Sequence, residues 1–197
     1  MSMNLSKEQI QKAQDAAVAL LERHGVSNRV AFDVQKLAEA ERFDVYDADF
    51  GSPKTFGAVW INDAEGAEGP EGGHREIFVS ADLLSQKRRK VIAHELGHYA
   101  LHSKKTSVGN DTCFEFNRID KAVENLPPEE QTREAEADCF ARALLMPSVL
   151  LKNAWIVYDR DHSNGSMTFI DYVSWAFDVT RDDAKKRWNE CLTLSLA

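Results

Sequence analysis

The stretch Ala93-His94-Glu95-Leu96-Gly97-His98-Tyr99 lies within residues 85–102, whose spacing of apolar residues predicts a helix. Each helical residue turns by about 100°, so His94 and His98 lie one above the other and their imidazoles can converge on one ion. Glu95 lies beside them, close enough to hold a water molecule at that ion without being a ligand. The opposite face collects apolar side chains, which we expect to be buried: Ile92, Ala93, Leu96 and Ala100.

The H-E-x-x-H spacing is a signature of zinc peptidases, although so short a pattern also arises by chance on helices whose histidines are merely packed or solvated. A catalytic zinc needs a third protein ligand and one position open to water. The extended motif, with a third histidine six residues after the second, is excluded because Lys104 occupies that position. The third ligand must therefore come from elsewhere. His102 could hydrogen-bond near the ion, but we favour a satisfied or solvated histidine at the end of its helix.

A second helix, predicted over residues 129–146 and bounded by prolines, supplies three acidic candidates for the third ligand. Glu134 falls about 60° from the centre of the apolar stripe of this helix, whereas Glu136 and Asp138 fall about 100° away on opposite sides. Glu134 therefore suits the metal best. Asp138, four residues later on the same side, suits an outer carboxylate that accepts the free N–H of a ligating histidine. Glu136 is expected to be an ordinary solvated acid.

Two blocks of sequence, His94–His102 and Glu134–Pro147, together resemble the ImmA/IrrE family of metallopeptidases, which are small bacterial and phage zinc proteases. The N-terminal helices, the strands before the first block and the tail segment Tyr172-Val-Ser-Trp-Ala also fit the family layout, so the resemblance spans most of the chain. It implies an α+β fold of the gluzincin type. Helices would pack on a small, mostly antiparallel sheet, and the active-site helix would carry the motif.

By that resemblance, His94, His98 and Glu134 would bind zinc, and Glu95 would be the catalytic general base and acid. The implied activity is that of a site-selective zinc endopeptidase. Its partner would be a protein substrate, either a helix-turn-helix repressor or an antitoxin-like protein, in stress, phage or toxin–antitoxin-like transcription regulation. The residues that could stabilise the oxyanion are candidates by chemical type alone: Tyr99, His74 and His162.

Two alternative functions, a DNA-binding regulator and a catalytically silent binding module, are less well supported by the charge and the residues of the chain. The chain has 32 acidic and 24 basic residues, a formal charge of −8, so it has no electrostatic reason to bind nucleic acid as its main task. This balance disfavours a DNA-binding regulator, which Lys185, Lys186 and Arg187 in the tail suggest. A catalytically silent, zinc-containing protein-binding module is the other alternative. The presence of Glu95 argues against it, because a structural metal site does not need a base.

The 197 residues are predicted to form a single domain, with N-terminal helices in 1–50, a catalytic core in 55–147 and a helical tail in 148–197. Helices are expected over 6–24, 33–41, 168–177 and 182–192, and strands over 44–46, 57–61, 76–80 and 113–116. Either 57–61 or 76–80 would lie along the cleft and pair with an extended substrate. The acidic, glycine-rich stretch 62–75 is expected to be a solvated hairpin loop.

The N-terminus and the cysteines indicate the compartment. The chain has no run of eighteen apolar residues and no basic patch followed by an apolar segment, so we expect a cytoplasmic protein without a membrane span. Cys113, Cys139 and Cys191 form no C-x-x-C pair, so we expect buried or inert thiols rather than a disulfide framework or a cysteine zinc site.

Overall fold

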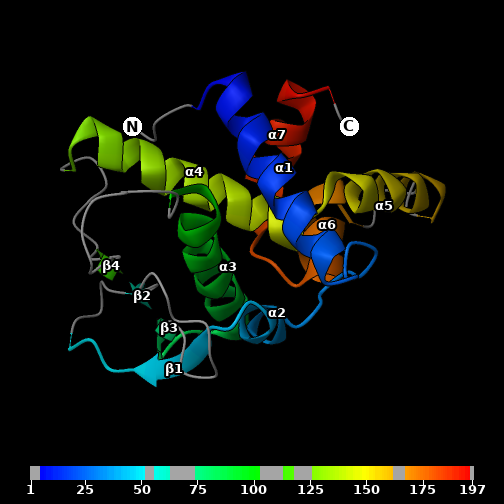
Figure 1. The fold of residues 1–197 in the computed structure, drawn as a ribbon. Helices are drawn as coiled ribbons and strands as arrows, with labels where there is room; N and C mark the ends of the chain where they lie inside the picture. Colours follow the sequence, from blue (N-terminus) through cyan, green and yellow to red (C-terminus); the bar gives the residue numbers. More distant parts are fainter. Residues whose placement is uncertain are drawn as a thin grey trace.

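The fold is seen in a computed structural model that describes residues 5–51, 56–62, 74–102, 113–117, 126–161 and 167–195. Helices and strands mix along these residues, which confirms the predicted α+β class (Figure 1). In chain order the elements are α1 (Lys7–Arg23), α2 (Val34–Ala40), β1 (Asp44–Ala48), β2 (Gly57–Asn62), β3 (His74–Ser80), α3 (Ser85–His102), β4 (Cys113–Asn117), α4 (Pro128–Leu145), α5 (Ser148–Asp161), α6 (Phe169–Phe177) and α7 (Arg181–Thr193).

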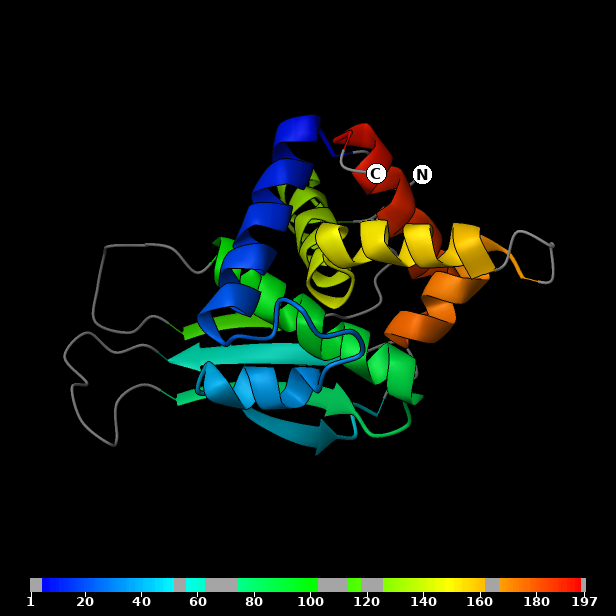
Figure 2. The same cartoon turned by 90° about the vertical axis from the view of Figure 1, so that its right-hand side faces the viewer.

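The sheet has the strand order β1-β3-β2-β4. β1 runs parallel to β3, whereas β2 pairs antiparallel with both β3 and β4, so the sheet is mostly antiparallel, as predicted. α3 lies between one face of the sheet and the helices α1 and α4 (Figures 1 and 2). The motif helix is therefore enclosed from both sides.

The prediction that residues 57–61 or 76–80 pair with the substrate is wrong. Residues 57–61 and 76–80 belong to β2 and β3, and each of these strands has neighbours on both sides, so neither has backbone groups left for a peptide. Within the described residues the two edges of the sheet are β1 and β4. β2 and β3 pair antiparallel with Asn62 opposite His74, as a hairpin requires; positions 63–73, on which the predicted solvated loop falls, lie outside the described residues.

The helices follow the predicted ranges within a few residues, with one omission. Residues 148–161 form α5, a helix that is absent from the predicted elements. Pro147 ends α4 and at the same time opens α5, because its carbonyl oxygen accepts the N–H of Leu151 at 3.0 Å. A proline that breaks one helix is easily overlooked as the start of the next.

Two glycines let the motif helix approach its neighbours closely. A methyl group on Gly57 of β2 would lie 2.3 Å from Val91 Cγ1, and one on Gly97 of α3 would lie 3.1 Å from the Cα atom and the carbonyl oxygen of Ala137 in α4. The first contact is closer than real Cβ atoms come, and the second is tight enough that the backbone of α4 would have to shift by a few tenths of an ångström. As a result every residue from Val91 to His98 is buried, the polar ones included.

The described residues include two of the three cysteines and the helices that could be tested as membrane spans. Cys139 and Cys191 are free, buried thiols, and burial raises the pKa of Cys139 to about 12, so this thiol is protonated and inert at neutral pH. The side chain of Cys113 lies outside the described residues. Among the helices in the described ranges, none is by itself long and apolar enough to cross a membrane; the bent pair Pro128–Leu145 and Ser148–Arg160 passes the length and composition test only jointly.

Candidate metal centre

The three side chains predicted as metal ligands come together where α3 crosses α4. His94 and His98 project from α3, one turn apart, and Glu134 projects from the first half of α4. The Nε2 atoms of the two histidines are 2.9 Å apart. His94 Nε2 lies 3.3 Å from Glu134 Oε2, and His98 Nε2 lies 3.2 Å from Glu134 Oε1.

This geometry fits one small ion. Ligand bonds of about 2.0–2.1 Å around a tetrahedral zinc ion place the ligand atoms roughly 3.3 Å apart. The two nitrogen–oxygen separations, each to a different oxygen of Glu134, are close to that value, and the separation of the two nitrogens, 2.9 Å, is slightly shorter. Two imidazoles and one carboxylate are also the donor set of a catalytic zinc site, with the fourth position left for water.

The protonation states favour a cation. His98 is 2% exposed, and burial lowers its pKa to about 4, so its ring is neutral at neutral pH and offers a lone pair. Burial raises the pKa of Glu134, but the hydrogen bonds and charges of the two histidines outweigh this effect, and the pKa of Glu134 lies below its ordinary value. The pocket therefore presents the negative carboxylate of Glu134 beside the neutral imidazole of His98.

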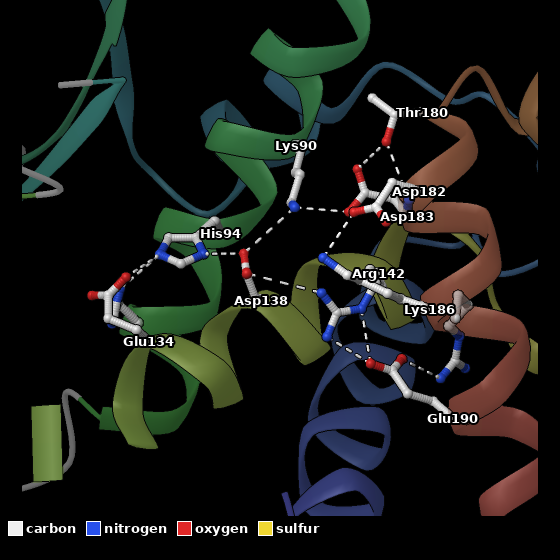
Figure 3. A network of polar contacts seen from close by, with 12 residues as sticks. Lys90, His94, Glu134, Asp138, Arg142, Thr180, Asp182, Asp183, Lys186 and Glu190 are labelled. Atoms are coloured by element: carbon white, nitrogen blue, oxygen red, sulfur yellow. Dashed lines mark hydrogen bonds and ion pairs between the residues drawn. The ribbon is translucent and has the colours of Figure 1, made fainter. Parts of the chain in front are cut away.

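Asp138 lies where its spacing predicted, at the outer nitrogen of His94. Its Oδ1 atom is 3.0 Å from His94 Nδ1. Lys90 and Arg142 flank the same carboxylate, with ion-pair distances of 3.7 Å and 3.9 Å (Figure 3). The carboxylate of Asp138 is thus oriented by one basic side chain from α3 and one from α4.

Lys90 and Arg142 in turn form ion pairs with acidic side chains of α7. Lys90 Nζ lies 2.7 Å from Asp183 Oδ1, and the guanidinium of Arg142 lies 2.6 Å from Glu190 Oε1 (Figure 3). The arrangement links α3, α4 and the C-terminal helix through charges that are mostly buried. No feature of the linear sequence pairs Lys90 with Asp183, which is 93 positions away.

Glu136 differs from the expectation, whereas His102 is a satisfied histidine that also hydrogen-bonds beside the ligand cluster. Glu136 is only 9% exposed, not solvated, and its Oε2 atom lies 3.1 Å from His102 Nε2. The other ring nitrogen of His102, Nδ1, is 3.2 Å from Nδ1 of His98. The prediction of a solvated acid was wrong because α1 packs along α4 and covers the side on which Glu136 lies. The available signal was the third histidine of the stripe His94, His98 and His102.

Glu95 is 1% exposed and lies against the start of β2, where a methyl group on Gly57 would be 3.0 Å from its Oε1 atom. Of the oxyanion candidates, Tyr99 packs edge-on against Phe43, with ring centroids 5.1 Å apart, and beneath the guanidinium of Arg75. The side chain of His74 and all of His162 lie outside the described residues.

The basic residues of the tail do not form one exposed patch. Arg187 is fully buried, and its guanidinium donates to the carbonyl oxygen of Met146 at 3.0 Å and to Gln14 Oε1 at 2.7 Å. Lys186 is exposed but pairs with Asp182 at 2.8 Å. The sequence run that suggested DNA binding therefore contains a residue that stabilises the core instead.

An α+β fold in which two histidines of an H-E-x-x-H helix and a glutamate of the following helix are placed to hold one ion defines a metallopeptidase of the glutamate-ligand type. Residues 42–189 match the profile of the M78 peptidases, described as the IrrE N-terminal-like domain. The match covers most of the chain, so the protein belongs to this family, as its resemblance to ImmA/IrrE proteins predicted. None of the curated proteins compared with the chain matches it.

Proposed function

We propose that this metallopeptidase is a zinc-dependent endopeptidase that cuts selected sites in a partner protein. His94, His98 and Glu134 would hold the zinc, and Glu95 would be the general base and acid. The observation that carries the proposal is the convergence of three ligand atoms beside a buried glutamate that is not itself one of them. Zinc bound there would supply Lewis acidity, lowering the pKa of water to about 7 and polarising the scissile carbonyl.

Side chains of the protein would carry out proton transfer and the orientation of the metal ligands. Glu95 takes the proton of the attacking water and passes it to the leaving amine. Asp138 accepts the Nδ1–H of His94, which selects the tautomer whose Nε2 lone pair faces the ion and fixes the direction of the ring. The low exposure of these groups strengthens each charge interaction, because little water screens them.

The strand that takes the substrate would be β4. It is an edge of the described sheet, and Asn117 at its end pairs with Ala58, the residue after Gly57. Gly57 of β2 contacts Glu95, and a peptide that adds to β4 as a further strand would lie two strand spacings, about 10 Å, from β2. This assignment replaces the interior strands β2 and β3.

The substrate would be a helix-turn-helix repressor or an antitoxin-like protein, whose cleavage switches a stress, phage or toxin–antitoxin-like programme in the cytoplasm. The family resemblance suggests this class of partner. The formal charge of −8 supports it, because a basic DNA-binding protein would be attracted to an acidic peptidase.

Metal analysis tests the ligand set. Purified protein should contain about one zinc ion per chain, and Glu134→Ala should lose it. Glu130→Ala is the matched control, since Glu130 lies on the same helix but is exposed, and it should keep the zinc. A wild-type protein that takes up no zinc after reconstitution would refute the proposal.

Digestion of purified helix-turn-helix repressors, followed by mass spectrometry of the fragments, tests the activity. We expect one or a few defined cuts in a true substrate. Zinc-loaded protein that binds such a repressor tightly and leaves it intact would instead favour the silent binding module.

A further inference from the structure

We infer that His102 is a positioning residue for the metal ligand His98, and that Gln9 of α1 acts on the same ligand through Glu136. The inference rests on the proposed metal site and adds to it a chain of contacts across three helices, α3, α4 and α1. Its members are His98, His102, Glu136 and Gln9, in that order.

The ion would determine the direction of the two hydrogen bonds that His102 makes. With Nε2 of His98 turned to the ion, its proton is on Nδ1 and is donated to His102 Nδ1, 3.2 Å away. His102 must then carry its own proton on Nε2, from which it donates to Glu136 Oε2 at 3.1 Å. One tautomer of each ring satisfies both bonds, so the pair favours the ring state that binds metal.

Gln9 makes the last contact in this series, a hydrogen bond to Glu136. Its Nε2 amide donates to Glu136 Oε1 at 3.1 Å. The amide oxygen of the same side chain accepts the backbone N–H of Ser6 at 2.9 Å, as part of the capping box that begins α1. Because the capping bond fixes the oxygen, the NH₂ group must face Glu136. Gln9 lies before the matched residues 42–189, so an element outside the family domain contributes to the site.

The geometry gives the two histidine ligands different outer partners. His94 contacts the carboxylate of Asp138 directly, whereas His98 reaches the carboxylate of Glu136 through a neutral imidazole. The side chains of His102 and Glu136 are 7% and 11% exposed, so water competes little for these bonds. His102 is not a further ligand in this arrangement, because one of its nitrogens faces Glu136 and the other faces His98.

Zinc affinity tests the inference, measured by competition with a chelator on protein that circular dichroism shows to be folded. His102→Leu should bind zinc about tenfold or more weakly, the usual effect of removing an outer partner. In His102→Asn the amide oxygen takes the position of Nδ1 and can still accept from His98, so affinity should return to within about threefold of wild type. The visible spectrum of the cobalt-substituted variants should keep the intensity of a four-coordinate site.

A second pair of variants keeps the test valid where His102→Leu does not fold. Gln9→Met removes the donor to Glu136 and should weaken zinc binding by about threefold or more. Gln11→Met is the matched control, because Gln11 lies on the same helix and bonds only to Asp15 within it among its described hydrogen bonds; its affinity should equal that of wild type.

The outcomes separate this inference from the proposed function. A wild-type protein without zinc would overturn both. A zinc-loaded wild type whose affinity is unchanged in folded His102→Leu, or in Gln9→Met, would overturn the inference alone. So would a His102→Asn variant as weak as His102→Leu, since packing and not hydrogen bonding would then explain the loss.

Discussion

Glu95, the proposed general base, directly follows the metal ligand His94 in sequence but does not belong to the ligand cluster. It lies beside the ligand cluster, buried against Gly57, and a carboxylate there can shuttle a proton without competing for the ion. This division of roles predicts that ligand and base variants have different phenotypes: loss of metal in one case, loss of turnover in the other.

Glu95→Gln should therefore keep its zinc and lose peptidase activity, by about 10²-fold or more, because general acid–base catalysis contributes an effect of that size. Zinc content and the rate of repressor cleavage, measured on the same preparation, check this expectation. Cleavage at the wild-type rate by the zinc-loaded variant would show that another group moves the proton.

At the scale of elements, the crossing of α3 and α4 decides whether Glu134 reaches the histidines. Gly97 makes that crossing possible, since a methyl group there would meet the backbone of Ala137 at 3.1 Å and the ring of Phe140 at 3.0 Å. Backbone atoms cannot turn aside as a flexible side chain can, so the two helices would have to separate.

Gly97→Ala should destabilise the metal-free protein by about 1–3 kcal/mol, the usual effect of overpacking a core. It should also weaken zinc binding, because Glu134 moves away with α4. Urea unfolding and chelator competition measure the two effects separately. Wild-type values for both would mean that the crossing tolerates a side chain.

The docking of α7 depends on buried charge. The side chains of Glu190 and Arg142 are 12% and 10% exposed. Burial lowers the pKa of Arg142, but the neighbouring carboxylates of Glu190 and Asp138 raise this pKa by more. The guanidinium of Arg142 is therefore charged. Removing one partner leaves a buried charge without compensation.

Glu190→Gln should consequently destabilise the protein by about 3 kcal/mol in urea unfolding. Asp182→Asn on the same helix is the matched control: it breaks the exposed pair with Lys186, and its effect should stay below about 1 kcal/mol. Equal effects of the two substitutions would contradict the distinction between buried and exposed pairs.

For the whole molecule, the metal centre joins elements that are far apart in sequence. Its ligands and their outer partners Asp138 and His102 come from α3 and α4, α1 and α7 contact the charged groups around them, and Glu95 contacts the sheet. Metal bound to this centre should stabilise the folded chain as a whole, because the unfolded chain does not hold these groups together.

Removal of zinc should lower the unfolding temperature by about 5–10 °C, given roughly 2.7 kcal/mol of stabilisation at a zinc concentration a hundredfold above Kd. Differential scanning calorimetry with and without a chelator measures the shift. Glu134→Ala should show no such shift, and an equally large one in that variant would place the stabilising metal elsewhere.

Much of the fold could be predicted because the deciding patterns are local. Helical spacing placed α3 and α4 within two residues and put His94, His98, Glu134 and Asp138 on the faces where they lie. Alternation and turn residues located the four strands. The division into one domain with three parts stays a prediction.

Local patterns predict which helices carry the site and which of their faces bear its chemistry, because a helix repeats its geometry over a few residues. Tertiary packing settles which strands are edges of the described sheet, that Glu136 and Arg187 are buried, and that Gln9 and α7 contact the groups around the ligands. Those outcomes depend on what packs against each outer face, and contacts between residues a hundred positions apart leave no periodic trace in one sequence.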